Sequence, residues 1–177
     1  MEHRCIFAGF GGQGIISMGT LLAYAGMLAD KNSTFFPEYG IAMRGGTANC
    51  TVIVSDAEIA SPVVSDPNVV AAMNGFSLDR FQPMVSAGGF LFVNESLVNK
   101  RAERSDLAPV YVKATGIALE HGDVMMANMA MLGAVIKKTS MVPLEVMFKA
   151  MEKIFPSKIK HLVSKNQDVM RCGYESV

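Results

Sequence analysis

The sequence predicts an α/β fold: a three-layer α/β/α Rossmann-like domain with a mixed sheet and a helical C-terminal third. Three observations predict it. A strand, a glycine turn and a helix succeed one another at the start, further apolar runs of strand length fill the middle, and long helical patterns occupy the end. A chain of 177 residues has the size of one domain with a substantial core, so we expect a single domain over 1–177.

The first unit is a short apolar run, Cys5–Ala8, that leads into a glycine-rich turn. The turn matches the pattern G-x-G-x-x-G, and apolar residues recur at helical spacing from Ile15 to about Ala29. Without Cβ atoms, such a turn lets backbone N–H groups and the positive end of a helix approach a phosphate or another peptide surface. The alternative is a turn that only lets the helix pack on the sheet.

An ordinary NAD-binding unit is disfavoured by the segment after this helix. Ser33–Phe36 is a second candidate strand, and Glu38 lies near the place where such a unit carries an acidic residue for the ribose. The chain does not turn into another helix there. It continues into a glycine-rich loop with one arginine, Ile41–Gly46, and then into a new β-like run.

The middle of the chain carries the remaining strand candidates. They are Thr47–Val54, a short return strand Glu58–Ser61 that would form a hairpin with it, Val69–Met73, Phe90–Val93 and Val110–Lys113. Ser77 is expected to cap a helix that runs through about Val85.

The final third predicts three helices: Val124 to Ile136 after Asp123, a second from Pro143 through about Ile154, and a third from Ser157 through about Arg171. Methionine is unusually dense in this region, which suits either core packing or a contact with another subunit.

Composition limits the classes of function. Half of the residues are hydrophobic, which favours a large buried or partner-covered surface. Lys plus Arg equals Asp plus Glu, so we expect no nucleic-acid partner. Three separated cysteines and three separated histidines offer no metal-ligand spacing. No signal peptide or membrane-spanning run is visible, so we expect a cytoplasmic protein without a membrane partner.

Three motifs carry a family resemblance: Gly9–Gly14, Pro37–Cys50 and Ser61–Val64. Together they resemble the gamma subunit of the 2-oxoacid:ferredoxin oxidoreductases. Phe76–Phe81, Asn128–Gly133 and Lys165–Glu175 look similar to later landmarks of the same family, so the resemblance spans nearly the entire chain. It looks closest to the 2-oxoglutarate type, although Ile41-Ala42 stand where family members often show Pro-Glu.

The resemblance implies a multisubunit enzyme that oxidatively decarboxylates a 2-oxoacid, passes electrons to ferredoxin and transfers the acyl group to coenzyme A. Thiamine diphosphate, magnesium and iron–sulfur clusters are then expected on partner subunits: alpha, beta and, where present, delta. This chain is expected to bind no cofactor alone, to carry no catalytic residue and to be inactive alone. It can share in coenzyme A binding.

The glycine turn and the arginine loop supply the predicted cofactor-binding residues. These are Gly9, Gly11, Gly12, Gln13, Gly14, Tyr39, Arg44, Gly45, Gly46, Thr47 and Asn49. Two alternatives remain for the loops, which serve either a ligand or only a subunit interface. Two also remain for the protein: a free-standing Rossmann-like nucleotide-binding module, or the gamma-type subunit of a pyruvate, branched-chain or indolepyruvate relative.

Overall fold

The computed structural model describes residues 1–39 and 46–177, which build one sheet flanked by helices. The strands have the order β2-β3-β1-β4-β5-β6. Their bounds are β1 (Glu2–Phe10), β2 (Asn32–Tyr39), β3 (Thr47–Ser55), β4 (Val69–Ala72), β5 (Phe90–Asn94) and β6 (Ala108–Val112).

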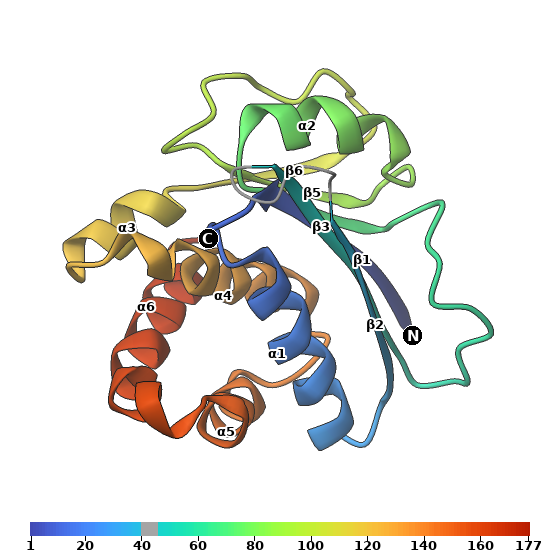
Figure 1. Cartoon of the computed structure of the whole chain (residues 1–177). Helices are drawn as coiled ribbons and strands as arrows, with labels where there is room; N and C mark the ends of the chain where they lie inside the picture. Colours follow the sequence, from blue (N-terminus) through green and yellow to red (C-terminus); the bar gives the residue numbers. More distant parts are fainter. Residues whose placement is uncertain (40–45) are drawn as a thin grey trace.

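The helices cover the two faces of this sheet unequally (Figure 1). Most of them, α1, α4, α5 and α6, lie on one face, and α2 lies on the other. The α-helices are α1 (Ile15–Leu28), α2 (Gly75–Phe81), α3 (Ala114–Glu120), α4 (Ala127–Thr139), α5 (Leu144–Ile154) and α6 (Val163–Glu175), with 3₁₀ turns η1 (Gln82–Met84), η2 (Val124–Met126) and η3 (Ser157–Leu162). The predicted α/β class and helical C-terminal third are confirmed, with one thick and one thin helical layer.

Strand β1 lies at the centre of the sheet and supplies both cores. Cys5 and Phe7 belong to the large core under the helical layer, whereas Ile6 and Ala8 belong to the smaller core under α2. All four side chains are buried. A strand covered on both faces reads as a continuous apolar run, which is the pattern that marked it in the sequence.

The sheet is mixed because β3 runs antiparallel between β1 and β2, whereas β4, β5 and β6 continue parallel to β1. The predicted return strand Glu58–Ser61 is wrong, since these residues form no strand. Both edges of β3 are already paired, with β1 and with β2, so no edge is left for a hairpin partner after Ser55.

Several helix boundaries also differ from the sequence predictions. Asn74, not Ser77, caps α2: its Oδ1 accepts the N–H of Ser77 at 2.9 Å. Asp123 caps the short turn η2 rather than a long helix, and α4 begins only at Ala127. Ser157 opens another 3₁₀ turn, so the last α-helix starts at Val163.

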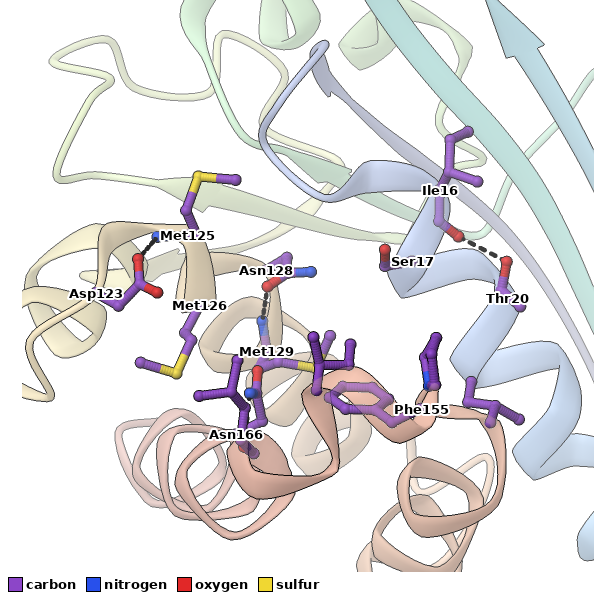
Figure 2. Close-up of a pocket in the computed structure, with 14 residues that line it drawn as sticks. Ile16, Ser17, Thr20, Asp123, Met125, Met126, Asn128, Met129, Phe155 and Asn166 are labelled. Carbon is purple, nitrogen blue, oxygen red and sulfur yellow. Dashed lines mark hydrogen bonds between the residues drawn. The ribbon is translucent and has the colours of Figure 1, made fainter.

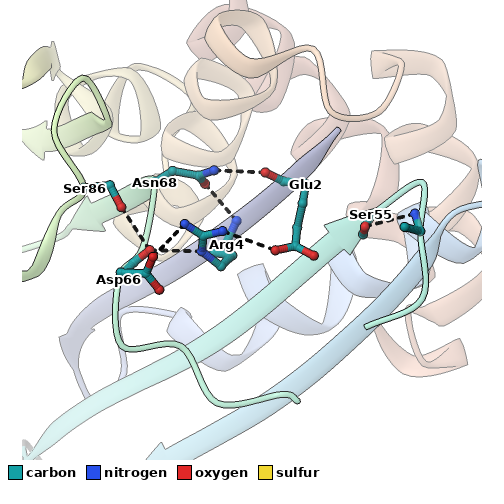
Figure 3. Close-up of polar contacts among 7 residues, drawn as sticks. Glu2, Arg4, Ser55, Asp66, Asn68 and Ser86 are labelled. Carbon is teal, nitrogen blue, oxygen red and sulfur yellow. Dashed lines mark hydrogen bonds and ion pairs between the residues drawn. The ribbon is translucent and has the colours of Figure 1, made fainter. Parts of the chain in front are cut away.

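The connection before β4 is fastened to the start of β1 by a polar cluster at the amino edge (Figure 3). Arg4 bonds Asp66 twice, through Nη2 to Oδ2 at 2.9 Å and through Nε to the backbone oxygen at 3.0 Å. Asn68 accepts the N–H of Arg4 at 2.8 Å and donates to the Glu2 carbonyl at 2.9 Å. These bonds therefore hold the connection before β4 against the start of β1.

Helices α4 and α6 touch through their backbones at two glycines. A Cβ on Gly173 would lie 2.6 Å from the carbonyl carbon of Ala130, and one on Gly133 would lie 2.8 Å from the backbone nitrogen of Tyr174. Most methionines of this layer, Met129, Met131, Met147 and Met151 among them, are buried in the core, whereas Met125 is exposed. None of the described helices is long and apolar enough to cross a bilayer.

Candidate functional site

The glycine turn leaves β1 at the carboxyl edge of the sheet, beside the end of β2 and the start of β3. Phe10 is in register with Thr47, and Tyr39 with Ala48. Strands β1 and β2 run in the same direction, because each is antiparallel to β3. The expectation that the turn and the arginine loop share one edge is confirmed for the residues that flank the loop.

A backbone hydrogen bond joins the two predicted motifs directly: the N–H of Gly11 donates to the carbonyl of Gly46 at 2.8 Å. Thr47, next to it, is half-buried, and Asn49 is buried. Arg44 and Gly45 lie outside the described residues. The described part of the site is thus a turn with exposed backbone, Gly11 and Gly12, held against the start of β3.

The glycines of the turn serve different purposes. Gly14, with φ at 71°, caps α1 and faces Asn128, whose Nδ2 donates to its carbonyl at 3.2 Å. A Cβ on Gly9 would lie 2.7 Å from Oε1 of Gln13. Both positions therefore make room for the protein's own side chains. Gly12 differs: its φ is 98°, and a Cβ there would meet no atom within 4 Å. Gly12 therefore faces open space.

The Gln13 side chain closes the crevice between β1 and β4. Its Oε1 accepts the N–H of Phe10 at 2.8 Å and Nδ2–H of Asn74 at 3.0 Å, while its Nε2 donates to the Met73 carbonyl at 3.4 Å. Asn94 donates to the same carbonyl at 3.5 Å. Amide groups therefore hold the turn to the strand next to it.

This crevice is the topological switch point of the sheet, because the helix after β1 lies on one face and the helix after β4 on the other (Figure 1). Dinucleotides of open α/β folds bind at such a point. A cavity of only about 140 Å³ remains beside it, next to Gly12 and Thr115. Cofactor pockets start at about 300 Å³, so the described part of this crevice is too small for the ordinary dinucleotide mode.

Two exposed aromatic rings flank the turn, and the sequence reasoning missed their pairing. Phe10 is 38% exposed and Phe76 53% exposed, and their rings stack with centroids 6.5 Å apart. Residues so far apart in sequence gave no local signal of this contact. Exposed aromatic surface beside open backbone is suited to a ligand ring or to a partner subunit.

A larger groove, of about 360 Å³, lies between α1, η2 with α4, and the segment joining α5 to α6 (Figure 2). Its walls are mainly apolar and include Met126, Met129 and Phe155. Asp123 lies at its rim and adds negative charge, and its Oδ1 accepts the N–H of Met125 at 2.9 Å. No Lys, Arg or His is among the described residues that line it, so the groove offers no cationic partner for a phosphate. Its walls come from distant segments, and the sequence reasoning did not find it.

The shifted ionisable groups include one carboxylate and two buried thiols. Asp56, whose pKa falls to about 2, lies at the opposite edge, where hydrogen bonds from Lys31 and the N-terminal amine favour its carboxylate. Burial raises the pKa of the Cys50 thiol to about 12 and that of Cys5 further. Among the residues that the structure describes, no three His, Cys, Asp or Glu side chains gather as a metal site. The described site can bind through backbone, amide and aromatic groups.

Comparison with known sequences finds one matching family model and several relatives. The family model "Pyruvate ferredoxin/flavodoxin oxidoreductase" matches residues 4–176. The 2-oxoglutarate synthase subunit KorC of Methanocaldococcus jannaschii is 34% identical, over 99% of this chain and 94% of that protein. The pyruvate synthase subunit PorC of Thermotoga maritima is 33% identical, over 96% and 91%. The ketoisovalerate oxidoreductase subunit VorA of Methanothermobacter marburgensis is 39% identical, but the match spans 76% of this chain and only 28% of that protein.

Solved structures agree with this grouping. The gamma subunit of a keto/oxoacid ferredoxin oxidoreductase from Geobacter sulfurreducens superposes with a TM-score of 0.86 at 26% identity, covering 99% of this chain and 95% of that one. A 2-oxoglutarate:ferredoxin oxidoreductase from Magnetococcus marinus shares the fold, with a TM-score of 0.88 at 18% identity over 99% of this chain and 31% of that chain. The chain belongs to the pyruvate ferredoxin/flavodoxin oxidoreductase family, and it matches separate gamma subunits of that family over nearly their whole length.

Proposed function

We propose that this chain is the gamma subunit of a thiamine-dependent 2-oxoacid:ferredoxin oxidoreductase, that the 2-oxoacid is 2-oxoglutarate, and that the chain contributes to coenzyme A binding at its glycine turn. The KorC relatives, at 33–34% identity over nearly the whole chain, are the basis for choosing 2-oxoglutarate, and the PorC relative at 33% identity makes pyruvate the alternative substrate. The Magnetococcus enzyme that shares this fold was solved with 2-oxoglutarate, coenzyme A and succinyl-CoA bound.

The observation that carries the proposal is the open backbone at Gly12. The turn is fastened on both sides, by Gln13 to β4 and by Gly11 to Gly46, yet a Cβ at Gly12 would meet nothing within 4 Å. Backbone N–H groups of such a turn can donate to phosphate oxygens. Coenzyme A carries phosphates, and here they would approach from the outside of the turn, because the crevice on its other side is closed.

The remaining chemistry is assigned to partners in this proposal. Alpha, beta and, where present, delta subunits would hold thiamine diphosphate, magnesium and the iron–sulfur clusters and would pass electrons to ferredoxin. This chain offers them exposed apolar surface, including Phe76 and Phe36. The alternative of a free-standing dinucleotide module is disfavoured by the amide groups that fill the switch point.

The test is Gly12→Ala in the assembled complex, with Gly88→Ala as the matched control. Both glycines have a positive φ, 98° and 75°, and at both a Cβ would meet no atom within 4 Å. Both substitutions therefore impose a similar backbone strain of about 1–3 kcal/mol. They differ in place, since Gly88 precedes β5 and lies at the opposite edge of the sheet.

Alanine keeps the backbone N–H, but it rarely adopts a φ of 98°, so the turn should shift and its N–H groups should lose their alignment with the phosphate. We expect Gly12→Ala to raise the KM for coenzyme A about tenfold, which corresponds to the loss of roughly one charge-assisted hydrogen bond. Gly88→Ala should leave this KM unchanged, although it should lower the melting temperature about as much as Gly12→Ala does. Equal KM values for coenzyme A in both variants would reject the ligand role of the turn. Failure of only Gly12→Ala to assemble would instead assign the turn to a subunit interface.

A further inference from the structure

A thiol and an imidazole meet on the helical side of the molecule, away from the glycine turn. Cys172 of α6 places its Sγ 3.7 Å from Nε2 of His121, the residue that ends α3. The other ring nitrogen of His121, Nδ1, lies 2.9 Å from the carbonyl oxygen of Ile117. A carbonyl can only accept, so Nδ1 carries the proton and Nε2 presents its lone pair to the thiol.

These three groups have the arrangement of an activated nucleophile: a thiol, a base within hydrogen-bonding reach, and a group that orients the base. Both residues are half-buried, so neither is sealed inside the core. The other cysteines provide a contrast within the same chain. Cys5 and Cys50 are both 0% exposed and have no histidine beside them among the contacts of the described residues.

We propose that Cys172 is a site of reversible modification by low-molecular-weight disulfides, with His121 as its base. The thiol proton moves to Nε2 of His121, and the sulfur attacks one sulfur of the reagent. A new S–S bond forms to Cys172 while the S–S bond of the reagent breaks, and the released thiolate takes the proton from the imidazole. Cys172 is thereby oxidised and one reagent sulfur reduced to a thiol, so no further oxidant is needed.

The position gives such a modification a structural consequence. Gly173, the next residue, is where α6 touches the backbone of α4, and His121 lies on the α3 side of Cys172. An adduct on the sulfur must displace the imidazole and loosen α3 from α6. The site thus joins a half-buried thiol to the packing of the thick helical layer.

The experiment measures how fast the full chain releases coloured thiolate from dithiobis(nitrobenzoate) at neutral pH. We expect one fast equivalent from the folded protein, abolished in Cys172→Ser, with Cys5 and Cys50 reacting only after denaturation. His121→Gln should slow the fast phase at least about tenfold, since a positioned base contributes that much or more. Glutathione disulfide followed by intact-mass measurement should give one adduct, removed by a reducing thiol.

The matched control is His161→Gln, because His161 is exposed and makes no contact with Cys172 in the described structure. It should react like the unaltered chain. If His121→Gln does not fold, as judged by thermal melting, His121→Phe keeps a ring without nitrogen and gives the same comparison. The proposal is overturned if loss of the imidazole leaves the rate unchanged, or if Cys172 reacts no faster than the two buried cysteines.

Discussion

Gly173→Ala tests whether the α4–α6 contact is as close as the structure has it. The added Cβ would lie 2.6 Å from the carbonyl carbon and 2.7 Å from the Cα of Ala130, and closer still to the carbonyl oxygen. Every one of these atoms belongs to the backbone of α4, so no rotamer change can relieve the clash. The two helices would have to separate by about 1 Å, against the close packing of the core.

The expected loss can be worked from two opposing effects. Alanine in place of glycine inside a helix gains about 1 kcal/mol. Overpacking of a well-packed core costs about 1–3 kcal/mol and occasionally more, and a backbone clash belongs at the upper end. We therefore expect a net loss of about 2 kcal/mol, which lowers the melting temperature of a chain this long by roughly 4–8 °C.

Thermal and urea denaturation followed by circular dichroism measure this loss, with Gly116→Ala as the control. Gly116 also lies in a helix, but a Cβ there would meet its nearest atoms only at 3.7 Å, an ordinary contact. Its substitution should therefore leave stability unchanged or raise it by up to about 1 kcal/mol. If Gly173→Ala stabilised the chain as much as Gly116→Ala, the inferred backbone contact between α4 and α6 would be refuted.

Two further predictions concern charge. Asp56 has its pKa lowered to about 2, first by the hydrogen bond from Lys31, so its contribution to stability is complete above the unfolded value near 3.8 and is lost as the pH falls toward 2. The difference in urea midpoint between the unaltered chain and Asp56→Asn should shrink over that window, whereas a constant difference would contradict the assignment. Arg44, predicted from the sequence alone, should act on coenzyme A: in the assembled complex Arg44→Ala should raise its KM about tenfold and Arg44→Lys should recover only part of the loss, because an ammonium cannot form the bidentate fork. An assembled Arg44→Ala enzyme with unaltered coenzyme A kinetics would remove Arg44 from the proposed site.

Local signals predicted the first unit well. The apolar run, the glycines and the helical spacing lie within about thirty residues, and β1, the turn and α1 match them closely. The signals were also sufficient for β4 and β5, which are short apolar runs covered on both faces. The sequence offered no cap for α3, whose start at Lys113 makes no side-chain capping bond, and this helix was not predicted.

The features that sequence could not supply depend on contacts between distant residues. The predicted hairpin partner of β3, Glu58–Ser61, was wrong. Strand order is decided by pairing across the sheet, and the turn after β3 looked like the turn of a local hairpin. Gln13 was predicted as a ligand residue, yet its amide bonds to Asn74 and Met73, about sixty positions away. The role of Gly14 likewise depends on Asn128, which comes from the last third of the chain. The assignment of the turn to coenzyme A stays a prediction.

The amide groups between β1 and β4 restrict how this fold could acquire a new ligand. A domain whose switch point is empty can be retargeted to a dinucleotide by changing the residues of its rim. Here Gln13 fills the crevice while also bonding the backbone of Phe10, so shortening it opens space and releases the turn in one step. Asn74 would lose a partner in the same change and also caps α2. A route toward NAD binding therefore requires at least two coordinated substitutions, and each alone passes through a less stable protein.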